Sequence, residues 1–303
     1  MPPVLERVTS REIPKDRIKL WIIADFGWGD LAFSEVADEL YSLVPGISAE
    51  KLSLPPFSTL STGFAIRQLG LRRYYPGKLI FSNTAPRGMD EGIPWHGSAK
   101  QRLLFGILDS GVPVAAISSG YNWSFVKDRI GKDEDGVPLF FDIDISNEGS
   151  QFRSRDIYPG AIKRLIDRDE TVLGERIDPA SIPDYPRNQV MYVDGYKNIK
   201  ISTPESEFDP ALKVSPQLNV TLNGITRTAH NALSGLIPNE GLVLRTGSSG
   251  DIDDPFIELQ LVGGHARKLF EPPDKEFVYV DNGNLVTFGP ATDAGDLSES
   301  RAA

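Results

Sequence analysis

The chain of 303 residues contains no cysteine and only three histidines. Without cysteine the protein has no disulfides, no thiolate nucleophile and no zinc–thiolate site. His96, His230 and His265 are scattered along the sequence, and P-loop, HExxH, GxSxG and EF-hand motifs are absent. We therefore expect no metal site and no required cofactor.

Long apolar runs and a basic excess are missing as well. No apolar run approaches the roughly 18 residues that a membrane-spanning helix needs, and residues 1–17 lack the apolar core of a signal peptide. The formal net charge of −10 disfavours nucleic acid, because phosphate binding requires a basic surface. The sequence thus predicts a cytoplasmic protein that binds neither membranes nor nucleic acid.

Between its polar ends the chain changes character once. Residues 18–182 alternate apolar, strand-like runs with apolar residues at helical spacing. Strand-like runs lie at 19–25, 51–55, 78–83, 102–108, 112–117 and 139–145, and helical patterns lie at 33–44, 58–75 and 156–166. The runs 102–108 and 112–117 flank Asp-Ser-Gly, which predicts a hairpin-type turn between them. This alternation predicts an α/β domain with a mainly parallel, doubly wound sheet between helices.

Helical spacing disappears after residue 188. Short strand candidates, separated by glycine, asparagine and proline, follow at 190–193, 199–202, 218–222, 241–246, 256–261 and 277–280. The pattern predicts a smaller all-β, barrel-like domain over 188–288. The boundary is expected between 180 and 190, within the proline-rich stretch IDPASIPDYPRN. Residues 1–17 and 289–303 are predicted to be loose tails.

The stretch KLWIIADFGWGD at residues 19–30 is typical of the first strand of a parallel sheet. A continuous apolar run ends at Asp25, Gly27 and Gly29 allow a sharp turn, and Asp30 follows. Ligands bind outside the carboxyl ends of such strands. A carboxylate there suits the vicinal hydroxyls of a ribose, or a metal ion. The alternative is that Asp25 only caps the helix that follows.

Further motifs follow this stretch in a defined order. They are YYPGKLIFSNTAP (74–86), FRSRDIYPGA (152–161), YVDGYKNIKIS (192–202), GSSG (247–250) and IELQLVGGHA (257–266). Together with ADFGWGD they resemble the S-adenosyl-L-methionine (SAM) hydroxide adenosyltransferases, or SAM hydrolases, and the related fluorinase and chlorinase. That family reads TDFGxxD, FPxGTV, F(H/Y)(G/S)RD, DRFGN and SSGxLEIA. The resemblance covers most of the chain, including the change to an all-β carboxyl-terminal domain.

The resemblance implies that the first domain supplies the ribose and nucleophile contacts. Asp25 matches the acid that hydrogen-bonds the ribose hydroxyls, and Asp30 lies in the same motif. Ser154, together with Arg155 and Asp156, matches the element that lines the nucleophile pocket beside the sulfonium and C5′. SAM is then expected as a substrate or ligand.

The second domain would supply the other ligand contacts. Asp194 and Asn198 match the DRFGN element, which reaches the methionine and the nucleoside. Ser248 and Ser249 match the loop that meets the adenine. In this family the small domain of one subunit closes the site on the large domain of its neighbour, so the resemblance implies a homotrimer in which Asn198 and Ser249 face a neighbour's Asp25.

The water-positioning residues of the hydrolases are not all present. Those enzymes use an aspartate, an arginine and a histidine, but Arg153 occupies the histidine position and the aspartate is replaced around residues 84–86. Arg102 or Arg87 is left as the arginine, and the PDNG element reads SSGYN at 118–122. Ser154 matches the halogenating branch. The candidate catalytic residues are therefore Ser154, Arg153 and Arg102, and the charge of Arg153 suits an anion.

Two functions follow from this pattern, and a third is an alternative. The first is cleavage of SAM at C5′ to adenosine and methionine, slowed because alignment of the nucleophile supplies part of the barrier reduction. The second is a nucleoside-binding or sensing protein without turnover. The third takes ADFGWGD as the start of a nucleoside hydrolase whose clustered aspartates hold calcium, for which only Asp25 and Asp30 are available.

Overall fold

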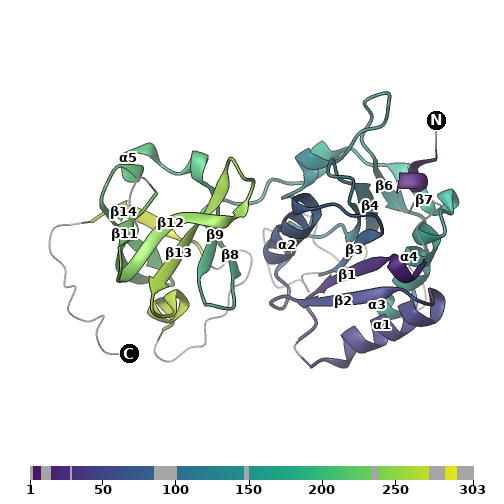
Figure 1. Ribbon diagram of the computed structural model, residues 1–303, viewed down its shortest axis with the longest axis horizontal. Coiled ribbons are helices and arrows are strands. Elements are labelled where there is room, and N and C mark those ends of the chain that lie inside the picture. The colour runs from purple at the N-terminus through teal and green to yellow at the C-terminus, as the bar shows by residue number, and fades with distance from the viewer. Residues whose placement is uncertain are drawn as a thin grey trace. The chain divides into compact units, whose positions relative to one another are not determined.

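The computed structural model describes residues 3–7, 15–27, 29–84, 101–146, 150–233, 238–272 and 284–291 (Figure 1). The chain forms two compact units, Met1–Tyr185 and Pro186–Ala303, which divide within the proline-rich stretch. Each unit contains a seven-stranded sheet. Within the described ranges, no helix is both long and apolar enough to cross a membrane.

The sheet of the first unit is mixed. Its strand order is β2-β1-β3-β5-β4-β6-β7. The pairs β2-β1, β1-β3 and β3-β5 are parallel, whereas β5-β4, β4-β6 and β6-β7 are antiparallel. The strands are β1 (Lys19–Ala24), β2 (Ser48–Ser53), β3 (Lys78–Asn83), β4 (Leu103–Ile107), β5 (Pro113–Ile117), β6 (Phe140–Ile143) and β7 (Leu173–Arg176).

The prediction of a mainly parallel sheet is therefore wrong, and the connection between β4 and β5 explains the difference. A tight turn joins these two strands, with a hydrogen bond from the backbone N of Gly111 to the carbonyl O of Leu108. So short a connection joins only antiparallel strands, because parallel strands need a longer crossover. Every residue of β4 is buried, so its sequence shows the continuous apolar run that is also typical of a parallel strand.

Helices cover both faces of this sheet. α1 (Leu31–Leu43), α3 (Arg153–Asp156) and α4 (Tyr158–Ile166) contact one another, and α1 and α4 share a core with β1 and β3. α2 (Thr59–Arg72) contacts β1, β3 and β5, and its buried residues lie outside that core, so it packs on the opposite face. Short 3₁₀ helices are η1 (Val4–Arg7), η2 (Lys15–Arg17), η4 (Lys127–Arg129), η5 (Glu170–Val172) and η6 (Pro179–Ser181).

The amino-terminal segment is less loosely held than its polar composition suggests. Leu5 is fully buried and belongs to the core between the sheet and α1 and α4. Its backbone N donates to Glu170 Oε1 at 2.6 Å. Burial of one leucine side chain contributes about 1.5–3 kcal/mol, which is enough to hold a short segment in place.

α2 packs closely on the turn at residues 118–126. A Cβ on Gly63 would lie 2.3 Å from the carbonyl O of Tyr121, so the helix requires glycine at this contact. The backbone N of Tyr121 donates to Thr59 Oγ1 at 2.9 Å. Arg67 Nη1 donates to the carbonyl O of Phe125 at 2.7 Å. The first two turns of α2 are therefore bonded to both halves of the 118–126 turn.

The second unit does not form the smaller all-β barrel that the sequence predicts. Its sheet has as many strands as the first, in the order β14-β10-β11-β12-β13-β9-β8, and β11 pairs with β12 in parallel. Short helices, η7 (Glu205–Glu207), α5 (Pro210–Lys213) and η8 (Ala266–Phe270), accompany it. The strands are β8 (Val190–Val193), β9 (Ile199–Pro204), β10 (Gln217–Leu222), β11 (Ile225–Asn231), β12 (Gly241–Gly250), β13 (Pro255–Val262) and β14 (Thr287–Pro290).

The reason for this second correction is that strand spacing does not specify strand partners. β11 and β12 follow each other in the sequence but pair in parallel, so they do not form a hairpin. Strand runs at regular spacing look the same in the sequence whether consecutive strands pair in parallel or as a hairpin. β14 includes residues 289 and 290, which the composition assigns to a tail. The strand expected at 277–280 lies outside the described residues.

A buried ion pair joins two strands of the second unit. Lys200 of β9 and Glu258 of β13 are register partners, and Lys200 Nζ lies 2.7 Å from Glu258 Oε2. Both residues are buried. Removal of one partner from such a pair leaves an uncompensated buried charge.

The packing of α2 predicts opposite effects for one substitution at two helical glycines. Gly63→Ala should destabilise the first unit by about 1–3 kcal/mol, because the new methyl group meets the carbonyl O of Tyr121. Gly160→Ala in α4 should stabilise it by about 0.5–1 kcal/mol, since nothing lies within 4 Å of the added Cβ and alanine favours helix. Urea unfolding measures both, and a stabilising Gly63→Ala would contradict the close packing.

Candidate functional site

The carboxyl ends of β1, β2 and β3 meet where the strand order reverses. The chain passes from β1 to β2 on one side and then returns to β3 on the other side of β1. Ala24, the last residue of β1, is the register partner of both Ser53 and Asn83. Asp25 therefore follows the central strand at a switch point of the sheet, which is the usual ligand position in open α/β sheets.

Asp25 is half-buried and is held by the segment that precedes α2. The backbone N of Phe57 donates to Asp25 Oδ2 at 3.0 Å. Phe57 has φ 62°, a conformation that non-glycine residues rarely adopt and that is often found at functional sites. The hydrogen bond from Phe57 therefore fixes the orientation of the Asp25 carboxylate at the end of β1.

Asp30, and not Asp25, caps the helix that follows β1. Asp30 Oδ1 accepts a hydrogen bond from the backbone N of Ala32 at 2.9 Å at the start of α1. The side chain of Asp30 is exposed. The two acids of the ADFGWGD motif thus have different structural roles, and of the two only Asp25 directly follows β1, next to the register partner of Asn83.

Aromatic contacts bring α3 to this edge. Ser53 Oγ donates to the carbonyl O of Phe26 at 2.5 Å. The ring of Phe26 packs edge to face on Phe152, with 5.9 Å between the ring centroids, and on Phe33 at 5.1 Å. Phe152 immediately precedes α3, so residues after β1 and residues at the start of α3 are in direct contact.

Ser154 completes the group of side chains at this edge. It is only 5% exposed, and Asn83 Nδ2 donates to its Oγ at 3.0 Å. The sequence analysis did not single out Asn83, although a polar residue at the end of a buried strand was a usable signal. We refer to Asp25, Phe26, Asn83, Phe152 and Ser154 as the edge cluster. It combines one carboxylate, two aromatic rings and two neutral polar groups.

Arg153 and Asp156 flank Ser154 in α3. Arg153 is half-buried and near Tyr158: burial raises the pKa of the Tyr158 phenol, and the charge of Arg153 partly opposes this shift. The Tyr158 hydroxyl is buried without a hydrogen-bond partner among the described residues. Asp156 is exposed, and hydrogen bonds from Arg155 and Ser150 lower its pKa.

Arg102 does not join the edge cluster. It precedes β4, and its Nη1 lies 2.8 Å from Asp142 Oδ2 on β6. β6 is three strand positions from β3, which corresponds to roughly 14 Å at about 4.8 Å per strand. The guanidinium of Arg102 is therefore directed away from Ser154. Burial raises the pKa of Asp142, and the charge of Arg102 partly offsets this shift.

Asp194 and Asn198 are brought together in the turn between β8 and β9. Asp194 Oδ1 accepts from the backbone N of Tyr196 at 2.9 Å and of Asn198 at 3.0 Å. Asn198 Nδ2 donates to Asp194 Oδ2 at 3.1 Å. Lys197 adopts φ 65° between them. The carboxylate of Asp194 therefore shapes the turn that presents Asn198.

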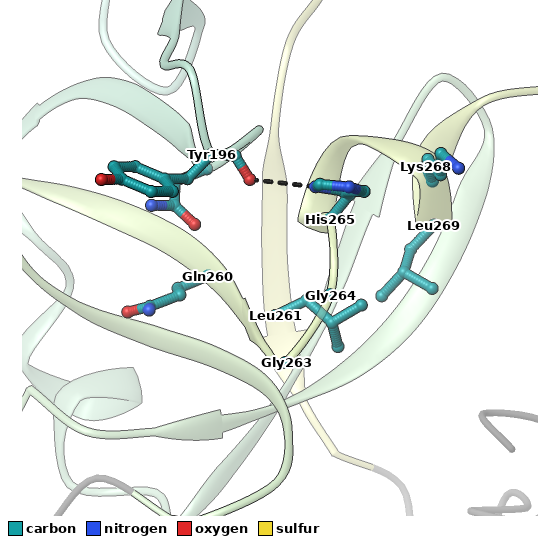
Figure 2. Close-up of a pocket in the computed structure, with 9 residues that line it drawn as sticks. Tyr196, Gln260, Leu261, Gly263, Gly264, His265, Lys268 and Leu269 are labelled. Atoms are coloured by element: carbon teal, nitrogen blue, oxygen red, sulfur yellow. Dashed lines mark hydrogen bonds between the residues drawn. The ribbon is translucent and has the colours of Figure 1, made fainter. Parts of the chain in front are cut away.

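Asn198 also lines a pocket of about 660 Å³ within the second unit. His265 lies at this pocket, and its Nδ1 is 3.2 Å from the carbonyl O of Tyr196. Figure 2 draws this contact as a dashed line. The sequence analysis did not identify this pocket, whose walls come from separate parts of the chain. The lining residues are Tyr196, Asn198, Gln260, Leu261, Gly263, Gly264, His265, Lys268 and Leu269.

Ser248 and Ser249 lie at a bulge in β12. The register of β12 against β13 shifts between Thr246 and Gly250. Ser249 is buried, and its Oγ has no hydrogen-bond partner among the described residues, whereas Ser248 is exposed. A Cβ on Gly247 would lie 2.4 Å from the carbonyl O of Phe256, so glycine is required there. Bulges of this kind often place side chains at functional sites.

One candidate for the hydrolase arginine, Arg87, lies outside the described residues, and so does His96. Among the residues that are described, no group of three or more histidine, aspartate or glutamate side chains is arranged to hold a metal ion.

Comparisons with known proteins show structures with a similar fold and indicate no activity. No family model matches the chain, and no curated protein matches it. An uncharacterized conserved protein from Thermotoga maritima is similar in structure, with a TM-score of 0.62 and 13% identity over 89% of this chain and 100% of that chain. A conserved hypothetical protein from Thermus thermophilus has a TM-score of 0.55 and 15% identity over 89% of this chain and 99% of that chain.

Because the pKa of Asp142 is raised in the folded protein, the free energy of unfolding should depend on pH. Replacement of Asp142 should remove this contribution. A folded-state pKa above the unfolded value favours folding while Asp142 is protonated, and this contribution is lost as the pH rises through the raised pKa. The unfolding free energy of the wild type minus that of Asp142→Asn should therefore decrease between about pH 4 and pH 7. Urea titrations measure it, and a difference that grows with pH would contradict the assignment.

Proposed function

We propose that the first unit binds the adenosine moiety of SAM at the edge cluster and cleaves SAM slowly at C5′. The observation that carries this proposal is the position of Asp25: it follows the central strand at the switch point, is oriented by the backbone N of Phe57, and comes one residue after Ala24, the register partner of Asn83. The resemblance to SAM hydrolases supports the choice of ligand. Asp25 would accept hydrogen bonds from the ribose hydroxyls, and the Phe26 and Phe152 rings would shield the site from water.

The proposed reaction demands little acid–base chemistry. Water oxygen attacks C5′, the C5′–S bond breaks, its electron pair stays on sulfur as methionine, and a proton leaves the attacking water for solvent. The protein has to align the water, which is where the barrier reduction arises. Ser154 and Asn83 are suited to hydrogen-bond it. Within the described ranges, no carboxylate or imidazole is hydrogen-bonded to Ser154 Oγ, so we expect the rate to be low.

Binding without turnover is the second candidate function. Two observations favour it: Arg102 is engaged by Asp142 away from Ser154, and Arg153 stands where the hydrolases have histidine. A permanent guanidinium charge near the pocket disfavours the cationic sulfonium of SAM in a low-dielectric environment. An adenosine ligand without the sulfonium would not meet this repulsion.

The sequence also suggested a calcium-dependent nucleoside hydrolase, a homotrimer and a cytoplasmic location. A calcium-dependent nucleoside hydrolase is not favoured, because Asp30 caps α1 and does not join Asp25 in a cluster. A homotrimer, and a cytoplasmic location, stay predictions of the sequence. Adenosine-forming cleavage requires no further cofactor in this proposal.

Two aspartate variants test the site. Asp25→Ala should weaken adenosine binding about ten- to a hundredfold, because a charge-assisted hydrogen bond contributes roughly 1.5–3 kcal/mol. Asp30→Ala is the matched control: it should lower stability by about 1 kcal/mol through loss of the helix cap and leave affinity unchanged. Calorimetric titration with adenosine and thermal unfolding measure both. Equal affinities of wild type and Asp25→Ala would overturn the site.

Substitution of Arg153 separates slow cleavage from binding alone. Arg153→His should raise the rate of SAM cleavage about tenfold or more, because it removes a cation and supplies a group that can orient water. Arg164→His in α4, where the arginine pairs with Asp169, should leave the rate unchanged. Chromatography of SAM incubations measures adenosine. Rapid cleavage by the wild type that Arg153→His abolishes would contradict the proposed role, and binding without product from any variant would support the second function.

A further inference from the structure

We propose that residues 177–188 form a clamped joint, so that movement between the two units is confined to the junction between Tyr185 and Pro186. The proline-rich composition alone predicts a linker. In the structure, however, residues on each side of this junction are bonded to the unit to which they belong. This inference concerns the connection between the units and does not depend on the proposed ligand.

Lys127 anchors the segment on the first unit. Its Nζ donates to the carbonyl O of Ile182 at 3.0 Å and lies 2.5 Å from Asp184 Oδ1. The Lys127 side chain is 13% exposed and Ile182 is buried, whereas the Asp184 side chain is 86% exposed. An ion pair to an exposed carboxylate contributes little. The hydrogen bond to the Ile182 carbonyl and the burial of Ile182 therefore account for most of this anchor.

Tyr185 is anchored by stacking. Its ring lies on that of Phe125, with centroids 3.8 Å apart and planes inclined by 11°. Phe125 is buried and its carbonyl O accepts from Arg67 Nη1, so the ring beneath Tyr185 belongs to the rigid contact between α2 and the 118–126 turn. Aromatic pairs stabilise beyond the area they bury, and this pair holds the last residue of the first unit.

The residues after the junction are bonded to the second unit. Ser202 Oγ donates to the carbonyl O of Pro186 at 2.7 Å, and the backbone N of Gln189 donates to Ser202 Oγ at 3.1 Å. Asn188 is bonded to Thr203 through its backbone N at 2.9 Å and its Oδ1 at 2.7 Å. The end of β9 thus holds residues 186–189.

These anchors leave no unbonded residue between the units. Tyr185 is the last anchored residue of the first unit and Pro186 is the first of the second. Proline restricts its own φ to about −65° and disfavours helical conformations of the residue before it. Few torsions remain free, so we infer that the units pivot about one junction.

Distance measurements between two spin labels test the joint. The chain has no cysteine, so Asp38→Cys in α1 and Arg227→Cys in β11, both exposed, give one label in each unit. Labelled chains are diluted with unlabelled chains to suppress distances between molecules. A reference variant carries Gly-Ser-Gly-Ser between Tyr185 and Pro186, which makes a flexible connection without changing either unit.

We expect a distance distribution about twofold or more narrower in the parent than in the insertion variant. Lys127→Met with Tyr185→Ala should broaden it toward the insertion variant, whereas Lys132→Met, at an exposed lysine nearby, should not. Circular dichroism checks that the double variant folds. A parent distribution as broad as that of the insertion variant would overturn the proposal, and this comparison holds even if the double variant fails to fold.

Discussion

The close packing of α2 on the 118–126 turn is the contact on which the arrangement of the first unit depends. Gly63 has no side chain, so the helix backbone approaches the Tyr121 carbonyl directly. The segment before this helix presents the Phe57 amide to Asp25, and the turn carries Phe125, on which Tyr185 stacks. One backbone-to-backbone contact therefore fixes both a residue of the edge cluster and the end of the unit.

Apolar runs located most of the strands but few of their partners; the hairpin of β4 and β5, which the Asp-Ser-Gly turn predicts, is an exception. The observed bounds of β3 and β8 equal the predicted ranges 78–83 and 190–193, because each is a short apolar run between turn residues. β11, with the sequence ITRTAHN, was not predicted, since it buries little beyond Ala229. Parallel or antiparallel pairing depends on contacts between distant segments and on connection length, which is why both sheet predictions were wrong.

At the candidate site, too, the sequence did not predict which distant residues come into contact. The position of Asp25 at the end of a central strand followed from its place after an apolar run. The pairing of Asn83 with Ser154, and of Arg102 with Asp142, joins residues that are 71 and 40 positions apart in the chain. Neither pair has a local pattern. The same holds for the pocket of the second unit, where Tyr196 and His265 meet across 69 positions.

The buried pair of Lys200 and Glu258 also constrains how the sequence of the second unit can diverge. Replacement of either residue alone leaves a buried charge without its partner, whereas a joint change to two apolar residues of similar size is often neutral or stabilising. Selection for stability therefore disfavours each single substitution and tolerates the double substitution. We expect these two positions, 58 residues apart, to be inherited as a unit, retained together or exchanged together across related chains.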